Sequence, residues 1–271
     1  MSLLSAEEYF QQGQLDSAIS AAAEQVKNNP NDEHVRTLFV ELLCVKGEFE
    51  RADSQLHALM TLKPDLALNL AVWRQLIHAA QKRLDVYQLK AKPDMIDEPT
   101  KAIKRALDML LALQEKDADK ISSLLKETEI NKDDNKFLVN GDDAKNIRDL
   151  DDVTANFLEV LGTNGKYFWV DFSQVVEVEL SKPTRILELL WRKATIVLTN
   201  GTEGEVYLPA IYPKTDDDSA ALGKKTEWHN EFSLYQGIGL KTWLFGDLDL
   251  TIDEISSFKN KAHIDIKTKV G

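Results

Sequence analysis

The residues best suited to hold a metal ion are two runs of aspartate. The sequence DLDD spans residues 149–152 and DDD spans residues 216–218. Carboxylate oxygens are ligands that Mg²⁺ and Ca²⁺ prefer, but neither run has the spacing of an EF-hand loop. An aspartate is also a common helix N-cap, and Asp151 or Asp152 capping a helix from residue 153 would explain the first run. We therefore predict no metal site.

Residues for nucleophilic or cofactor chemistry are sparse. The five histidines form no HxH or HExxH pair, and the motifs GxSxG and GxxxxGK(S/T) are absent. The sequence GIGL at 237–240 is too short for a dinucleotide fingerprint, which needs a third glycine and a preceding strand. The single cysteine, Cys44, lies in the apolar run LFVELLCV and is expected to be a small buried hydrophobe. No cofactor is predicted.

A pocket in the second half of the chain is an open alternative. Glu227 and Trp228 in the sequence TEW, with Tyr212, could line it, or the aromatic rings could be core residues whose polar tips find partners. Arg185 and Trp191 raise the same choice, because a guanidinium stacked on an indole can contact a ligand or support the fold. An enzyme or small-ligand-binding protein would place its pocket among Asp151, Asp152, Arg185, Trp191, Tyr212, Glu227 and Trp228.

The elements that must position these residues begin with an internal repeat. Three pairs recur at an offset of 34 residues, namely Gly13 and Gly47, Ala18 and Ala52, and Pro30 and Pro64. Apolar residues at helical spacing predict two helices in 2–28 and two in 32–62, with a Gly turn at positive φ inside each pair. The small alanines would let the helices approach closely, and the prolines would follow the second helix.

This period and pattern resemble tetratricopeptide repeats. A degenerate third helical pair is predicted over 66–89 and 99–128, and its role is expected to be a cap against the second domain, since such units hide their apolar faces by stacking. In relatives that clamp a carboxylate, the inner face carries cations. Here the period places Glu7 and Glu41 on that face, with His34 and Thr37 nearby. A helix with apolar anchors and some Lys or Arg fits better, although the acids could simply be solvated.

Composition and charge narrow the class of protein. The chain has 271 residues, 43% apolar and 29% charged, which is ordinary for a globular protein. The formal net charge of −12 and the lack of long Lys/Arg runs argue against nucleic-acid binding. The start MSLLSAEEYF does not look like a signal peptide, and no segment approaches the ~18 apolar residues of a membrane helix. We expect no membrane insertion and a cytoplasmic location.

The second half has a different texture, and we predict an α+β domain at 131–271 after a helical domain at 1–130. Residues 131–152 are interpreted as a linker with one strand, followed by a short helix at 153–161. Strands are predicted at NGKYFWVDF and QVVEVEL, a hairpin over ATIVLT and EVYLPAIYP, a strand at LKTWLFGD, and a closing helix at TIDEISSF. The predicted fold class is therefore helical repeats fused to a small α+β domain with an antiparallel sheet.

Together the two halves resemble the ImpE family, also called SciE-type, of accessory proteins in bacterial type VI secretion. The resemblance rests on FVELLCVKGEFERADSQL in the first half and on four stretches in the second: IRDLDDVTANFLEVLGTNGKYFWV, PTRILELLWRKA, LPAIYP and TEWHNEF. Two positions depart from the family pattern. Ile211 stands where an Arg is frequent, and Lys241 stands where Arg is usual, so a cationic site of relatives would be weakened here.

The resemblance implies a function without catalysis. It implies an adaptor in a contractile secretion machine that binds a helix of the small sheath subunit, and indirectly serves the ring-shaped ATPase that recycles the sheath. In this interpretation the partner helix lays its apolar face into a groove of the repeat, where Glu7, His34, Thr37 and Glu41 lie. The alternatives are the enzyme or ligand-binding pocket described above and a general chaperone-type scaffold, which the acids at Glu7 and Glu41 disfavour.

Overall fold

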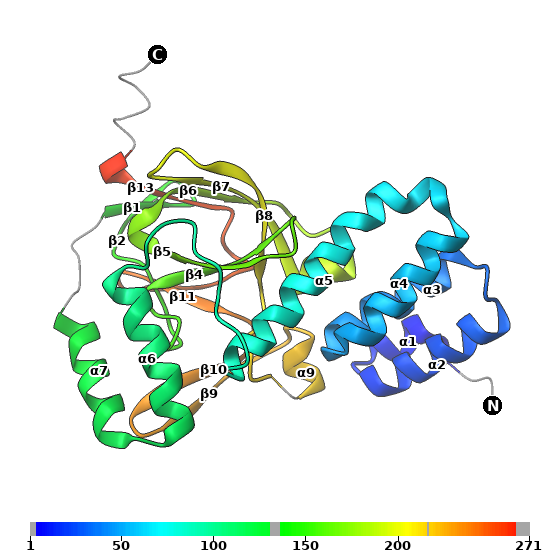
Figure 1. Cartoon of the computed structure of the whole chain (residues 1–271), viewed down its shortest axis with the longest axis horizontal. Coiled ribbons are helices and arrows are strands. Elements are labelled where there is room, and N and C mark those ends of the chain that lie inside the picture. Colours follow the sequence, from blue (N-terminus) through cyan, green and yellow to red (C-terminus); the bar gives the residue numbers. More distant parts are fainter. Residues whose placement is uncertain (1–3, 131–135, 216, 264–271) are drawn as a thin grey trace, which may run out of the picture.

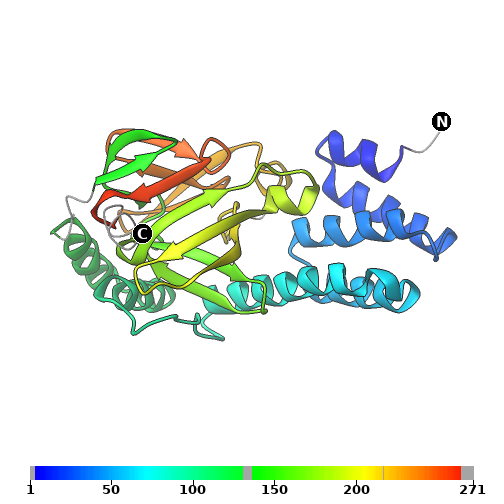
Figure 2. The same ribbon diagram turned by 90° about the horizontal axis from the view of Figure 1, so that it is seen from above.

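The computed structural model describes residues 4–130, 136–215 and 217–263. A row of helices forms one end of the molecule and a group of antiparallel sheets forms the other, with one long helix lying along both (Figures 1 and 2). No helix in the described part of the chain combines the length and apolarity that spanning a bilayer would require. The predicted fold class, helical repeats joined to an α+β half, is confirmed.

The two clear repeat units are helical hairpins, as predicted. They comprise α1 (Ala6–Gln11) with α2 (Leu15–Asn28), and α3 (Glu33–Lys46) with α4 (Phe49–Leu62). Gly13 and Gly47 both adopt a left-handed backbone, with φ of 77° and 78°, at the turn between the two helices. Ala18 and Ala52 are fully buried, and each helix from α1 to α4 packs on the next. The small side chains therefore stand at the predicted helix contacts.

Helix α5 (Ala67–Tyr87) follows a short 3₁₀ turn at Pro64–Leu66 and joins the two halves. It packs against α4 and also against strands of the sheet. The remaining helices, α6 (Lys101–Glu115) and α7 (Ala118–Ile130), form their own hairpin, in which Lys116 at φ 55° ends α6 without a glycine. This hairpin packs on β5 beside the sheets, whereas α5 packs on α4, so the two members of the predicted third pair, 66–89 and 99–128, do not form one stacked unit (Figure 1).

The main sheet has eight strands, all antiparallel, in the order β2-β1-β13-β6-β7-β8-β4-β5. A three-stranded sheet, β12-β11-β3, and a two-stranded ribbon, β10-β9, lie beside it. The strands are β1 (Lys136–Val139), β2 (Asp142–Lys145), β3 (Arg148–Asp149), β4 (Phe157–Gly162), β5 (Tyr167–Asp171), β6 (Val175–Leu180), β7 (Trp191–Leu198), β8 (Glu203–Pro209), β9 (Thr226–Glu231), β10 (Leu234–Gly239), β11 (Thr242–Phe245), β12 (Leu248–Thr251) and β13 (Ser257–Asn260). Short helices are α8 (Ile186–Leu190), α9 (Asp218–Ala221) and a 3₁₀ turn at Phe172–Gln174.

Three predictions of secondary structure were wrong. Instead of a linker with one strand, the described residues 136–152 hold β1, β2 and β3, because Asn140 and Gly141, both at positive φ, close a tight hairpin. Instead of a helix at 153–161, the chain turns and then forms β4, whose six residues are all buried in the middle of the fold. The closing helix at 251–258 is absent, and β13 pairs with β1 and β6 instead.

Two buried clusters fill the molecule. One runs from the repeat helices through α5 and α6 to one face of the sheet, where Phe157 and Trp169 stack with ring centres 4.2 Å apart. The other lies among the sheets around Phe172, Trp243 and Phe258. The division at residue 130 stays a prediction, since apolar side chains from both sides of it share the first cluster.

Candidate functional site

The inner face of the repeat is partly filled by the chain's own helix α8. Helix α8 packs against α3, and Leu187 is buried while Ile186 and Leu190 contact the same core cluster. Glu188 Oε2 fixes the start of α8 by accepting hydrogen bonds from the backbone N–H and the hydroxyl of Thr184, at 2.6 and 2.9 Å. A short apolar helix therefore already occupies this face.

Arg185, directly before α8, makes two contacts with the helices of the first half. Its guanidinium carbon lies 4.0 Å from the centre of the Trp73 ring, and its Nε lies 3.6 Å from Glu41 Oε1. Glu41 is only 6% exposed, so its predicted availability to an outside partner is corrected: α8 covers it. Burial raises the pKa of Glu41, while the charge of Arg185 and the backbone of Leu187 oppose that rise.

The other three residues predicted on the inner face remain accessible. The His34 side chain is 85% exposed and its Nε2 lies 3.9 Å from Glu7 Oε1, while Thr37 is half-buried. At the opposite end of α3, Lys46 Nζ pairs with Asp16 of α2 at 2.8 Å and with Asp218 of α9 at 3.1 Å. The second half thus covers α3 from Glu41 to Lys46 and leaves its beginning open.

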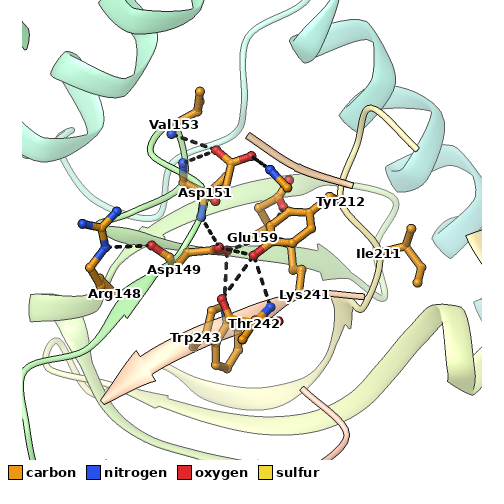
Figure 3. Close-up of polar contacts among 12 residues, drawn as sticks. Arg148, Asp149, Asp151, Val153, Glu159, Ile211, Tyr212, Lys241, Thr242 and Trp243 are labelled. Atoms are coloured by element: carbon orange, nitrogen blue, oxygen red, sulfur yellow. Dashed lines mark hydrogen bonds and ion pairs between the residues drawn. The ribbon is translucent and has the colours of Figure 1, made fainter. Parts of the chain in front are cut away.

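A second candidate is a cluster of buried charges between α5 and the sheets (Figure 3). Glu159 of β4 accepts two hydrogen bonds from Arg83 of α5, at 2.7 and 2.9 Å. Lys241 Nζ lies 2.9 Å from Glu159 Oε2 and 2.8 Å from Asp149 Oδ2. Asp149 also accepts hydrogen bonds from the Tyr212 hydroxyl at 2.7 Å and the indole N–H of Trp243 at 3.2 Å. The cluster therefore ties α5, β3, β4 and β11 together.

Asp151 belongs to the same cluster. Its Oδ1 accepts a hydrogen bond from the backbone N–H of Val153 at 2.8 Å, and its Oδ2 accepts one from Gly237 at 2.9 Å. The predicted N-cap role at residue 153 is thus corrected, because Asp151 closes a turn before β4 rather than starting a helix. Burial and the neighbouring Asp149 raise the pKa of Asp151 from 3.8 to about 7.

The charges of the cluster balance when Asp151 is protonated. Burial alone would raise the pKa of Glu159, but Arg83 and Lys241 outweigh it and hold that pKa well below its usual range. Burial alone would lower the pKa of Lys241, yet the charges of Asp149 and Glu159 raise it. Two cations then face two carboxylates. The side chains of Asp149, Asp151, Glu159 and Lys241 are at most 3% exposed and are hydrogen-bonded within the cluster. Such an enclosed network stabilises the positions of the strands and of α5.

The seven residues predicted for a pocket fall into separate groups. Asp151 and Tyr212 lie in the buried cluster, and the Trp228 ring packs on the Tyr212 ring with centres 5.8 Å apart. Asp152 accepts a hydrogen bond from Arg148 Nη2 at 2.8 Å. Glu227 is exposed beside Lys225. Arg185 stacks on Trp73 and not on Trp191, whose ring lies 6.1 Å from that of Phe49. A small hollow between α6 and residues 152–157 is lined in part by Arg105 and Asp152.

Neither aspartate run resembles a metal centre in the described chain. No group of three or more His, Cys, Asp or Glu side chains is placed to hold a metal ion there. Asp217 accepts a hydrogen bond from the Ala220 backbone N–H at 2.9 Å and caps α9; Asp216 lies outside the described residues. Cys44 is buried, as predicted, and burial raises the pKa of its thiol.

Sequence reasoning missed Arg83 and Glu159, and it considered Asp149 only as part of the DLDD run. Glu159 carried a faint signal, since it is the one charged residue in the apolar run FLEVLG, whereas Arg83 stands among other polar residues in LIHAAQKRLDVY and carried none. The two positions that depart from the family pattern also meet here. Lys241 is a central cation of the cluster, and the backbone oxygen of Ile211 accepts a hydrogen bond from Arg83 Nη2 at 3.0 Å.

Comparison with known proteins finds relatives that match most of the chain. It is 29% identical over 230 residues to the type VI secretion system accessory component TagJ of Pseudomonas aeruginosa, covering 82% of this chain and 80% of TagJ. The crystal structure of protein VPA1032 from Vibrio parahaemolyticus superposes with a TM-score of 0.90 at 30% identity, covering 96% of this chain and 99% of that one. Residues 141–259 match the model of the ImpE protein family. With the motifs of its second half and its repeat architecture, the chain belongs to the ImpE family.

Proposed function

We propose that this chain is a non-catalytic accessory protein of a type VI secretion system that binds a helix of the small sheath subunit. The likeness to TagJ, itself an accessory component of such a system, supports the general role. A cytoplasmic location and an indirect link to the ATPase that recycles the sheath belong to the same proposal.

The observation that carries the helix-binding part is the fit of α8 against α3. The repeat face accepts a short apolar helix with an arginine at its start, whose charge approaches Glu41. These are the features expected of a helix ligand for an acidic groove: apolar anchors and a cation. The second half of the chain therefore illustrates, within the molecule, the kind of contact that this face makes.

The open part of the face supplies the docking site of the proposal. It is bordered by Glu7 of α1 and by His34 and Thr37 of α3, next to the position of α8. An amphipathic partner helix with Lys or Arg on one side would continue the surface that α8 begins. The charge of Glu7 would favour such a partner and raise its rate of association.

The proposal of a non-catalytic role is supported by the environment of the buried groups whose pKa values are shifted. Asp151, Glu159 and Lys241 have shifted pKa values, a feature that can mark active sites. Here, however, their polar atoms are occupied by one another and by backbone groups, and the side chains are enclosed. A substrate would have to break that network before reaching any of them.

The test is a pull-down with the small sheath subunit in its full-length form and in a form lacking the helix. We expect recovery of the full-length form only. Glu7→Lys should reduce recovery about 3- to 10-fold, because it places a cation against a basic helix. Glu24→Lys, a matched reversal on the exposed side of α2, should leave recovery unchanged. Equal recovery of both sheath forms, or equal effects of the two variants, would contradict the proposal.

A further inference from the structure

The ribbon of β9 and β10 has one open edge. β10 pairs with β9 along six residues, while the other side of β9 meets no strand in the described part of the chain. All residues of β9 from Glu227 to Glu231 are exposed. A strand with one unpaired edge presents backbone donors and acceptors to which another extended chain can add.

The register shows which backbone groups point outward. Glu231 pairs with Leu234 across a two-residue turn, Phe232–Ser233, in which both φ values are positive, 56° and 63°. In such a hairpin the residues beside the turn exchange hydrogen bonds, and the bonding alternates along the strand. Glu227, His229 and Glu231 therefore bond toward β10, while Trp228 and Asn230 turn their N–H and C=O groups to the open edge.

Contacts on the far side of β10 agree with this alternation and hold the ribbon firmly. The N–H groups of Tyr235 and Gly237, opposite Asn230 and Trp228, donate away from β9 to Asp152 Oδ2 and Asp151 Oδ2, at 2.8 and 2.9 Å. The Tyr235 carbonyl in turn accepts a hydrogen bond from the Asp152 N–H at 2.9 Å. The open edge is thus fixed in an extended form before any partner arrives, which lowers the entropy cost of binding.

The two faces of β9 differ in chemistry. Trp228 and Tyr235 lie diagonally across one face and are 40% and 52% exposed. Glu227, His229 and Glu231 alternate on the other face, and their side chains are about half exposed. A strand added to this edge would meet aromatic rings on one face and carboxylates on the other.

We propose that the open edge of β9 binds an extended, basic segment of a partner protein as an added strand. The segment carries Lys or Arg opposite Glu227 and Glu231, four residues apart, and apolar residues opposite Trp228 and Asn230. This surface is separate from the inner face of the repeat, and the inference goes beyond the proposed function.

A second copy of the chain fits this edge poorly. In an antiparallel pair of two β9 strands, the outward-bonding residues Trp228 and Asn230 must face outward-bonding residues of the other copy. The longest such register centres on His229, and it sets Glu227 opposite Glu231 twice. Like charges directly opposite destabilise a strand pair, so the charge pattern favours a basic partner.

The test uses a labelled nine-residue peptide that alternates lysine with valine, and fluorescence anisotropy with the full-length chain. We expect saturable binding that Asn230→Pro weakens at least tenfold, because proline removes an outward N–H and spares the bonds to β10. Asn230→Ala keeps the N–H and should bind like the wild type. A peptide with alternate backbone nitrogens methylated should bind at least tenfold more weakly, which tests strand addition without altering the protein.

Several outcomes would overturn the inference. These are no saturable binding of the lysine–valine peptide, equal binding of the methylated and unmethylated peptides, or Asn230→Pro binding like Asn230→Ala. Sedimentation of the chain alone addresses self-pairing: a dimer that Asn230→Pro dissolves would show that a second copy takes the edge. Recovery of the sheath subunit should be unchanged by Asn230→Pro, so this inference and the proposed function can fail independently.

Discussion

The guanidinium of Arg185 stacks 4.0 Å from the ring centre of Trp73, joining the sheet half of the chain to the helix that spans both halves. The same side chain is the cation nearest the buried Glu41, at 3.6 Å. Glu41 Oε1 has no hydrogen-bond partner within the described structure. Arg185 therefore adds to the apolar contacts of Leu187 at the seam between α8 and the repeat, and a buried carboxylate is left with incomplete compensation there.

Replacing Arg185 should loosen this seam. We expect Arg185→Ala to lower the free energy of unfolding by about 2 kcal/mol, since it removes the cation–π contact and leaves Glu41 buried without a counter-charge. Glu41→Gln in the Arg185→Ala background should recover part of that loss, because the uncompensated charge is gone. Urea denaturation followed by circular dichroism measures both. An unchanged midpoint for Arg185→Ala would show that the contact does not hold α8 in place.

Lys241 should matter more than any surface lysine. Lys241→Met leaves Asp149 and Glu159 without the cation between them, and loss of one member of a buried pair costs about 3–5 kcal/mol. Lys241→Arg keeps the charge and should lose less. As a matched control, Lys193→Met removes a half-exposed lysine paired with Glu205 and should cost at most about 1 kcal/mol. Equal losses for Lys241→Met and Lys193→Met would contradict the role assigned to the cluster.

The repeat units were predictable from sequence because their signals are local. Gly13 and Gly47 needed a left-handed backbone, Ala18 and Ala52 marked close helix contacts, and all four act within one hairpin. The strands from β5 to β8 were found for similar reasons, through aromatic and β-branched runs separated by turn residues. The Asn140–Gly141 hairpin carried an equally clear signal, a tight-turn dipeptide, and was overlooked inside an acidic stretch.

The buried cluster could not be predicted because its partners are far apart in the chain. Glu159 looks like a solvated residue of a short helix until Arg83, 76 residues earlier, supplies its counter-charge. An apolar run as short as FLEVL does not distinguish helix from strand, and only burial on both sides made it a strand. The covering of Glu41 by α8 is likewise a contact between distant segments, so the sequence pattern alone could not show that α8 covers part of this face.

The raised pKa of Asp151 should give stability a specific dependence on pH. Between about pH 4 and pH 7 the folded chain keeps a proton on Asp151 that the unfolded chain has released, so this group's contribution to stability falls as pH rises through that range. Asp151→Asn cannot titrate, although it loses one backbone hydrogen bond at every pH. From pH 4 to pH 8 the wild type should therefore lose about 2–4 kcal/mol of unfolding free energy relative to Asp151→Asn.

Chemical denaturation of both proteins at several pH values checks this expectation. Other titrating groups are shared by the two proteins and largely cancel in the comparison. Asp152→Asn is the matched control. It makes the same chemical change at the neighbouring carboxyl group, which pairs with Arg148 at a less buried position. A wild-type-minus-Asp151→Asn difference that stays constant from pH 4 to pH 8 would mean that Asp151 is ionised in the folded protein.

A last prediction concerns the close approach of the ribbon to the buried cluster. A Cβ at Gly237 would overlap the ring of Tyr212, which is itself held by Asp149 and cannot swing away without breaking that hydrogen bond. Gly237→Ala should therefore lower the free energy of unfolding by about 2–3 kcal/mol, the cost of overpacking a buried contact. Gly204→Ala, where a Cβ meets open space, should change stability by less than about 1 kcal/mol and in the favourable direction. Thermal unfolding of the two variants measures this contrast, and similar melting temperatures would show that the ribbon does not rest on Tyr212.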